Sequence, residues 1–313
     1  MAHHLVLGAG GIGRSTAAHL VSRGHTVTLV SRSGQGAPHV GADLVAADAS
    51  DVDRLTTLAR GASSIVNAVN PPKYTTWDTD WPPVAAAILV AAQRSGAGLV
   101  TVSNLYAYGQ VSTPMREDLP LRPHGHKGEL RARMWRDALA LHEQGRISAV
   151  ELRASDYFGP GAQQGTSILN ELVIKRVAAG KAPLVPMGRP DAAHSWIYLD
   201  DIGSLAASVA ATPATNGRVW GRAWHVPSAP ARTLREVTAD VAAITGQRTP
   251  AIRVLPRAVG TALGTVVPLL RELRETRHQF ERPFILDSSA AETMFQLAPT
   301  AWEVALKATV DAL

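Results

Sequence analysis

The segment that decides the fold is residues 4–33, which read HLVLGAGGIGRSTAAHLVSRGHTVTLVSRS. A short apolar strand pattern leads into glycines spaced G-x-G-x-x-G, at Gly8, Gly10 and Gly13, and an amphipathic helical pattern follows directly. Gly8 permits a tight turn, Gly10 lets the backbone approach a pyrophosphate, and Gly13 lets the helix pack on the strand. The N–H groups at the start of that helix face an anion. The segment predicts a dinucleotide-binding site.

The end of the second strand predicts which dinucleotide binds. Ser31, Arg32 and Ser33 stand where an acidic residue, about 20 residues past the glycines, would bind the adenosine ribose of NAD. No acid is present there. Arginine between two hydroxyls favours a 2′-phosphate, because a guanidinium forks onto phosphate oxygens with charge-assisted bonds. We therefore expect NADP rather than NAD, the alternative being a solvated arginine in a polar turn.

Other expected cofactor contacts follow later strands. Asp48, after the third strand, is placed to reach the adenine amino group, and small residues around Ala68, after the fourth, leave room for the cofactor. The expected cofactor-binding set is Gly8, Gly10, Gly11, Ile12, Gly13, Ser31, Arg32, Ser33, Asp48, Ala68, Val69, Lys127 and Ala154.

The first half of the chain alternates strand and helix patterns. Strands are expected at residues 4–7, 26–30, 43–46, 64–67, 99–103 and 147–153, and helices at 11–23, 51–60, 82–95 and 128–143. This order predicts an α/β doubly wound parallel sheet, a Rossmann fold, with a smaller C-terminal substrate lobe. The expected division is residues 1–155 with parts of 190–227 for the NADP-binding domain, and 156–189 with 228–313 for the substrate lobe.

Composition narrows the function classes. The 313 residues are 46% hydrophobic and 18% charged, with net charge +5 and no cysteine. Lys and Arg form no block of about five like charges, which argues against nucleic acid. The absence of cysteine argues against disulfides and thiolate metal sites, and no apolar run reaches the roughly 18 residues of a membrane span. We expect a soluble, cytoplasmic protein with a small-molecule substrate and neither nucleic acid nor membrane as partner.

A series of ordered motifs runs along nearly the whole chain. They are the opening glycines, Asp48, NAV at 67–69, SNLYAYG at 103–109, HGHKGELRARMWR at 124–136, LRASDYFGPG at 152–161 and YLDDIG at 198–203. Together they resemble the extended short-chain dehydrogenase/reductase superfamily, in its NAD(P)-dependent epimerase/dehydratase branch. The resemblance implies a Rossmann fold, a nicotinamide cofactor and an enzymatic activity.

The catalytic positions depart from that family pattern. Asn104 stands at the place of the family's serine, and Lys127 and Arg131 stand at the places of its tyrosine and lysine. Gly128, which the family motif also contains, supports this register. The departure is similar to that of atypical members, whose activities are diverse and include cofactor binding without turnover.

Lys127 and Arg131 lie four apart, so they share one face near the start of the expected helix. Two cations there oppose the helix dipole and repel each other, a conflict that a nearby anion removes. In one interpretation Arg131 holds the ribose, Lys127 exchanges a proton and Asn104 polarises the substrate carbonyl. In another the pair grips an anion, and Tyr106 or Tyr108 supplies a phenol. In a third both cations lie on a solvated face and nothing is catalysed.

The leading hypothesis is an NADP(H)-dependent oxidoreductase acting on a small hydroxy or keto substrate, with Lys127 or a nearby tyrosine replacing the usual tyrosine. The alternatives are a redox-neutral epimerase or dehydratase and a non-catalytic NADP(H) sensor.

Several other residues receive weaker expectations. Asp156 and Tyr157 are candidates for substrate contact, with a turn-forming aspartate as the alternative. For His194 and Trp196 core packing is favoured. The pair His124 and His126 lacks a carboxylate at ligand spacing, so no metal site is expected. Residues 271–284, RELRETRHQFERPF, predict a solvated helix face or, alternatively, a homodimer contact.

Overall fold

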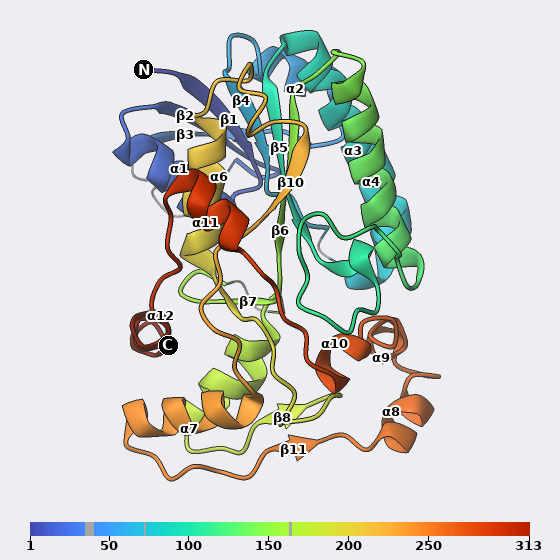
Figure 1. Cartoon of the computed structure of the whole chain (residues 1–313), viewed down its shortest axis with the longest axis vertical. Helices are drawn as coiled ribbons and strands as arrows, with labels where there is room; N and C mark the ends of the chain where they lie inside the picture. The colour runs from blue at the N-terminus through green and yellow to red at the C-terminus, as the bar shows by residue number, and fades with distance from the viewer. Residues whose placement is uncertain (35–40, 72, 163–164) are drawn as a thin grey trace.

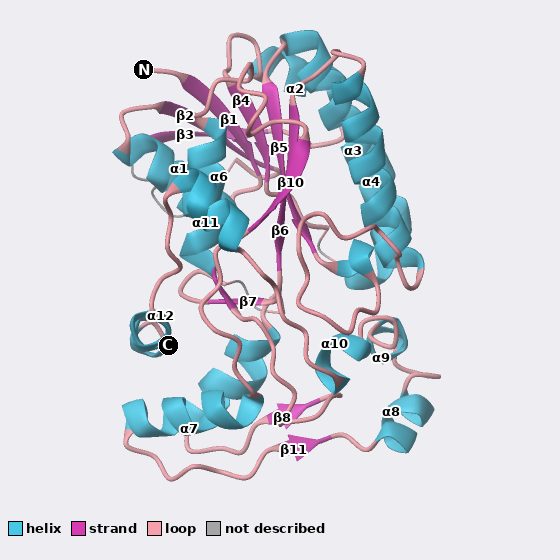
Figure 2. Ribbon diagram, in the orientation of Figure 1, coloured by secondary structure: helices cyan, strands magenta, loops and turns pink. Residues whose placement is uncertain are grey.

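The computed structural model describes residues 1–34, 41–71, 73–162 and 165–313. A twisted parallel sheet with helices on both faces forms the larger body, and a smaller lobe of short helices and strands lies beyond one end of the sheet (Figure 1). The secondary-structure colouring shows the same two layers of helix around the sheet (Figure 2).

The sheet confirms the predicted fold class. In the described residues its strand order is β10-β6-β5-β4-β1-β2-β3, and every neighbouring pair is parallel. The order reverses beside β1, so the crevice at the carboxyl ends of β1 and β4 is the expected ligand position. The strands are β1 (His3–Leu7), β2 (Thr26–Ser31), β3 (Ala42–Ala46), β4 (Ser64–Asn67), β5 (Gly98–Asn104), β6 (Ala149–Ala154) and β10 (Arg222–His225).

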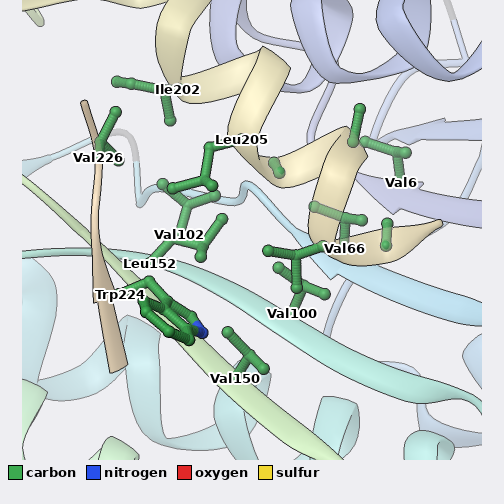
Figure 3. Close-up of a cluster of buried hydrophobic side chains, with 14 of the residues drawn as sticks. Val6, Val66, Val100, Val102, Val150, Leu152, Ile202, Leu205, Trp224 and Val226 are labelled. Atoms are coloured by element: carbon green, nitrogen blue, oxygen red, sulfur yellow. The ribbon is translucent and has the colours of Figure 1, made fainter. Parts of the chain in front are cut away.

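Two hydrophobic layers hold the helices on the sheet. On one face lie α1 (Gly11–Ser22), α6 (Leu199–Ala210) and α11 (Ser289–Phe295); on the other lie α2 (Val52–Leu58), α3 (Trp77–Ser95) and α4 (His126–Glu143). Val100, Val102, Val150 and Leu152 alternate along β5 and β6 and pack toward Leu205 of α6 (Figure 3). Period-two alternation sends the intervening side chains to the α3 and α4 face, where the site is built.

Helix α3 begins at Trp77 rather than at residue 82, where the sequence predicts its start. The paired prolines, Pro82 and Pro83, are typical of a first helical turn because proline lacks the N–H that an interior position donates. Here they lie inside the helix, and the turn before them is held by Trp77 and Trp81, which are buried against Leu130 of α4. Tertiary packing therefore overrides the local proline signal.

The smaller lobe has its own hydrophobic core. Its elements are β7 (Tyr157–Phe158), the π-helical turn η3 (Leu169–Ile174), α5 (Lys175–Ala178), β8 (Leu184–Val185), β9 (Ile197–Tyr198), α7 (Leu234–Thr245), β11 (Arg253–Val254), α8 (Arg257–Leu263), α9 (Pro268–Glu272), α10 (His278–Glu281) and α12 (Trp302–Asp311). One helix of segment 228–313, α11, packs on the main sheet and not in the smaller lobe. Its Phe295 contacts Trp224 of β10, with 5.3 Å between the ring centroids. Among the described helices none is long and apolar enough to span a membrane.

Candidate functional site

The glycine turn joins β1 to α1 with almost no spare space. Gly8 has a φ of +98°, and a Cβ on it would lie 2.7 Å from the carbonyl oxygen of Ala68, which directly follows the neighbouring strand β4. A Cβ on Gly13 would lie 1.8 Å from the carbonyl oxygen of Gly8. The N-cap, Gly10, offers no side-chain cap, and the first turn of α1 carries no acid. The uncapped helix start suits a diphosphate, so these residues fit a nicotinamide dinucleotide.

The predicted adenosine-side residues meet at the neighbouring ends of β2 and β3. The N–H of Ala47 donates to the carbonyl of Ser31 at 3.0 Å, which brings Arg32 and Asp48 to one edge of the sheet. The backbone N–H and hydroxyl of Ser50, at 2.8 and 2.7 Å, hold the pKa of Asp48 below its ordinary value, and the charge of Arg32 adds to this effect. Asp48 is therefore an acceptor, and Arg32 is the exposed cation beside it.

Lys127 is buried, not solvated. Its side chain is 1% exposed, and Nζ forms an ion pair with Glu272 at the end of α9. Nζ also lies 3.2 Å from Nε2 of His126 and 4.6 Å from the ring centroid of Tyr74, in the 3-10 turn η1 (Tyr74–Thr76). The interpretation that places this cation on a solvated face is wrong, because the second lobe covers the start of α4.

Residues 271–284 provide that cover, so the prediction of a solvated helix face is also wrong for this segment. Glu275 accepts the backbone N–H of Lys127 at 3.2 Å and pairs with Nδ1 of His126. Thr276 and Gln279 are buried. The anion that two cations at a helix start require is the chain's own: carboxylates at Glu272 and Glu275 face the N-terminus of α4. These contacts span 145 and 148 residues, so no local pattern signals them.

Arg131 is buried as well, at 5% exposure. Its guanidinium lies over two indole rings, 4.3 Å from the ring centroid of Trp81 and 4.8 Å from that of Trp77. Within the described part of the chain, Nε and Nη1 have no hydrogen-bond partner, and burial lowers the pKa of Arg131 to about 10. The side chain borders a cavity of about 20 Å³ under the sheet, whose polar lining is Asn67, Thr101, Ser103 and Glu151. Its predicted ribose contact remains a prediction.

The predicted phenol and amide lie just past β5. Tyr106 begins the 3-10 turn η2 (Tyr106–Tyr108), stacks on Trp77 and receives a hydrogen bond from the hydroxyl of Tyr74 at 3.4 Å. Burial raises the pKa of Tyr106 well above its ordinary value and that of Tyr74 to about 12. Both phenols therefore stay protonated at neutral pH. The side-chain oxygen of Asn104 accepts the N–H of Tyr106 at 3.1 Å, which fixes the amide at the strand end.

Tyr108, the other phenol that the sequence suggests, belongs to a different network. Its hydroxyl accepts from Nη1 of Arg153 at 2.7 Å and lies 2.8 Å from Nε2 of His225, while Nε of Arg153 donates to Glu151 at 2.6 Å. All four side chains are buried. Tyr108 therefore ties β5, β6 and β10 together.

Of the residues with weaker expectations, some are packed in the core and others have charged partners near the site. The side chains of His194 and Trp196 are 3% and 2% exposed, in agreement with the favoured packing role. Asp156 is paired with His194. His126 has carboxylate partners that the sequence does not signal, yet in the described residues no group of three His, Asp, Glu or Cys side chains is arranged to hold a metal ion.

Residues 4–220 match the profile of the NAD dependent epimerase/dehydratase family. The chain belongs to this family. The resemblance to extended short-chain dehydrogenases/reductases is thereby confirmed, and with it an enzyme that binds a nicotinamide cofactor.

One relative is a dTDP-6-deoxy-L-talose 4-dehydrogenase (NAD(P)(+)) of Kitasatospora kifunensis, 32% identical over 190 residues. That match spans 56% of this chain and 58% of the relative, so it covers little more than half the length of the relative.

Solved structures agree over the full length. A UDP-glucose 4-epimerase of Thermotoga maritima superposes with a TM-score of 0.81 at 16% identity, covering 99% of this chain and 98% of that one. A dTDP-glucose 4,6-dehydratase of Bacillus anthracis, in complex with NAD, gives 0.79 at 18% identity, covering 100% and 96%. At these identities the likeness shows the shared fold.

Proposed function

We propose that this enzyme is an NADP(H)-dependent oxidoreductase that interconverts a hydroxyl and a keto group on a small substrate. The observation that carries the proposal is a glycine turn and uncapped helix start that fit the dinucleotide, together with a cluster of largely buried ionisable groups nearby, Lys127, Tyr74, Tyr106 and Asp156. The relative whose name describes a 4-dehydrogenase supports a hydroxyl or keto carbon as the reacting centre.

The structure supports different roles for the predicted catalytic residues. Asn104 and the protonated Tyr106 are hydrogen-bond donors for the substrate oxygen. Lys127 forms an ion pair with Glu272, and its positive charge suits electrostatic support of an oxyanion. Arg131, over Trp77 and Trp81, is a buried positive charge under the same cluster.

A redox-neutral reaction is the second candidate, because the matching family is described as epimerase/dehydratase. In that case the bound cofactor takes up hydride and returns it within one turnover. Product that accumulates with no net change in NADPH absorbance would favour this candidate over the oxidoreductase.

The test is turnover with a panel of hydroxy and keto compounds that includes free sugars and nucleotide-linked sugars. We expect net NADPH oxidation with at least one keto compound, and NADP⁺ reduction with the matching alcohol. Cofactor binding, followed separately by nicotinamide fluorescence, shows whether the protein is correctly folded. A chain that binds NADPH but changes neither cofactor nor substrate across the panel would sink the proposed reaction.

Arg32→Asp tests the preference for NADP. We expect affinity for NADP(H) to fall roughly 10- to 100-fold, because a charge-assisted hydrogen bond contributes about 1.5–3 kcal/mol. Affinity for NAD(H) should stay within about twofold, or rise where the new carboxylate reaches the ribose. Fluorescence titration of both cofactors measures the ratio.

Arg60→Asp is the matched control, since it makes the same charge change on an exposed residue after α2, toward the amino ends of the strands. Equal losses for NADP(H) and NAD(H) in Arg32→Asp would argue against a 2′-phosphate contact.

A further inference from the structure

The imidazole of His194 is held in one orientation at the edge of the second lobe. Its ring stacks on Phe280, at 5.1 Å between centroids and 11° between planes. The backbone of His194 pairs with Arg232 on one side, and the N–H of Phe284 bonds to the neighbouring residue on the other. With the side chain 3% exposed, the ring cannot flip without opening this packing.

Both ring nitrogens of His194 face oxygen atoms. Nδ1 lies 3.1 Å from the carbonyl oxygen of Gln279, which can only accept, so Nδ1 carries a proton. Nε2 lies 2.9 Å from Oδ2 of Asp156 and 3.2 Å from the hydroxyl of Ser155. The short contact between Nε2 and Oδ2 is a hydrogen bond only when a proton lies between them. One hydrogen bond therefore joins the side chains of Asp156 and His194.

Asp156 stands at the end of the sheet where ligands bind. It lies two residues beyond β6, which ends at Ala154, and its charge acts on the phenols of Tyr74 and Tyr106. Its side chain is 25% exposed, whereas that of His194 is 3% exposed. The carboxyl group thus joins the buried imidazole to the carboxyl end of the sheet, where Tyr74 follows β4 and Tyr106 follows β5.

The other members of the cluster of ionisable groups are poorly suited to accept a proton. Tyr74 and Tyr106 keep their protons, because burial raises the pKa of both phenols. Nζ of Lys127 is engaged in its ion pair with Glu272. Hydroxyl oxidation nevertheless releases one proton for each hydride transferred, so a base must lie at the reacting oxygen.

We propose that Asp156, oriented by His194, is the catalytic base and acid that exchanges the proton of the reacting hydroxyl. The inference rests on the proposed oxidoreductase function. In the oxidation direction the C–H bond breaks with its electron pair, which leaves as hydride to the oxidised nicotinamide cofactor. The O–H bond breaks, its proton passes to the Asp156 carboxylate, and the C=O bond forms. Ketone reduction returns the same proton. His194 is a positioning residue that holds the carboxylate through the shared hydrogen bond.

Asp156→Asn, which keeps the shape and removes the base, is the test. We expect single-turnover hydride transfer to slow by about 10²- to 10⁴-fold, the range for a lost general base. NADPH affinity should stay within about twofold, since Asp156 does not hold the cofactor. Asp191→Asn is the matched control: an exposed aspartate of the same lobe that pairs with Arg235, where the rate should be unchanged.

A second readout needs no turnover. The proton in the hydrogen bond between Asp156 and His194 should give a solvent-protected NMR resonance downfield of the amide region in the wild-type chain, lost in Asp156→Asn and kept in Asp191→Asn. Absence of that resonance in the wild type would overturn this hydrogen bond. A rate in Asp156→Asn within about threefold of wild type would overturn the catalytic role while leaving the oxidoreductase proposal intact. A wild-type chain that turns over no compound in the panel removes both.

Discussion

Gly13→Ala is expected to abolish binding of the nicotinamide cofactor and to leave a chain that folds poorly. The new Cβ would lie 1.8 Å from the carbonyl oxygen of Gly8, which is backbone and cannot swing aside. Either α1 moves off β1 or the turn opens, and both displace the N–H groups that face the diphosphate. Overpacking of this kind costs about 1–3 kcal/mol or more. We expect NADPH affinity to fall more than about 100-fold, as measured by fluorescence titration, with a lower thermal midpoint.

The control for this substitution is Gly24→Ala, just beyond the same helix. Gly24 has a φ of +80° with nothing within 4 Å of the added Cβ, so the change strains the backbone without a clash. We expect a cost of about 1 kcal/mol and cofactor affinity within about twofold of wild type. A Gly13→Ala chain that binds NADPH like Gly24→Ala would show that the helix start is not where the diphosphate binds.

Glu272→Gln is expected to lower the free energy of unfolding by about 3 kcal/mol. The substitution leaves the ammonium of Lys127, 1% exposed, without its carboxylate partner, and breaking a buried ion pair from one side costs about 3–5 kcal/mol. Adding Lys127→Met should restore most of this loss, because the double variant has no unpaired buried charge. Urea unfolding of the two single variants and the double variant measures the coupling.

Glu171→Gln provides the matched control, since Glu171 pairs with Lys175 on an exposed helical surface at 2.6 Å. Such a pair contributes at most about 0.5 kcal/mol. Additive losses in the double variant, with no recovery, would contradict a buried pair between the lobes.

The ion pair between Lys127 and Glu272 also predicts that the free energy of unfolding falls at acidic pH. Burial of Glu272 acts to raise its pKa, but the hydrogen bond and charge of Lys127, with His126, hold that pKa below its ordinary value. Because the pKa of Glu272 is lower in the folded chain than in the unfolded chain, where it is about 4.3, the ionised carboxylate stabilises the fold at pH values above about 4.3. This stabilisation is lost as the pH falls through the pKa of Glu272 in the folded chain. The difference in stability between wild type and Glu272→Gln should therefore shrink below about pH 4.

The part of the fold that the sequence predicts is the part encoded locally. The strand, the glycine turn and the helix of residues 4–33 lie within one continuous segment, and the short apolar runs of β1, β4 and β5 identify buried parallel strands. The start of α3 could not be read the same way. Its first turn depends on Trp77 and Trp81 packing against α4, a contact that no helix signal within the segment contains.

In the candidate site, too, the sequence predicts the local features and misses the long-range contacts. Lys127 and Arg131 are two cations at the start of α4, where the helix dipole disfavours positive charge, so the sequence indicates that both need a compensating environment. The spacing of these two residues does not reveal that Glu272 compensates the charge of Lys127, or that two indole rings lie against the guanidinium of Arg131. The charged pattern of residues 271–284 is typical of a solvated helix, and only the arrangement of the second lobe over α4 makes it part of the site. Long-range charge pairs of this kind leave no periodicity in either segment.

Deuterium transfer from NADPH labelled at C4 of the nicotinamide to a recovered product tests the central claim most directly. The chain is incubated with labelled NADPH and the panel of keto compounds, and the products are analysed by mass spectrometry and NMR. We expect one deuterium on the carbon that bore the keto oxygen, in an amount equal to the NADPH consumed. Bound NADPH with no deuterium in any product, and no alteration of any substrate, would contradict the account.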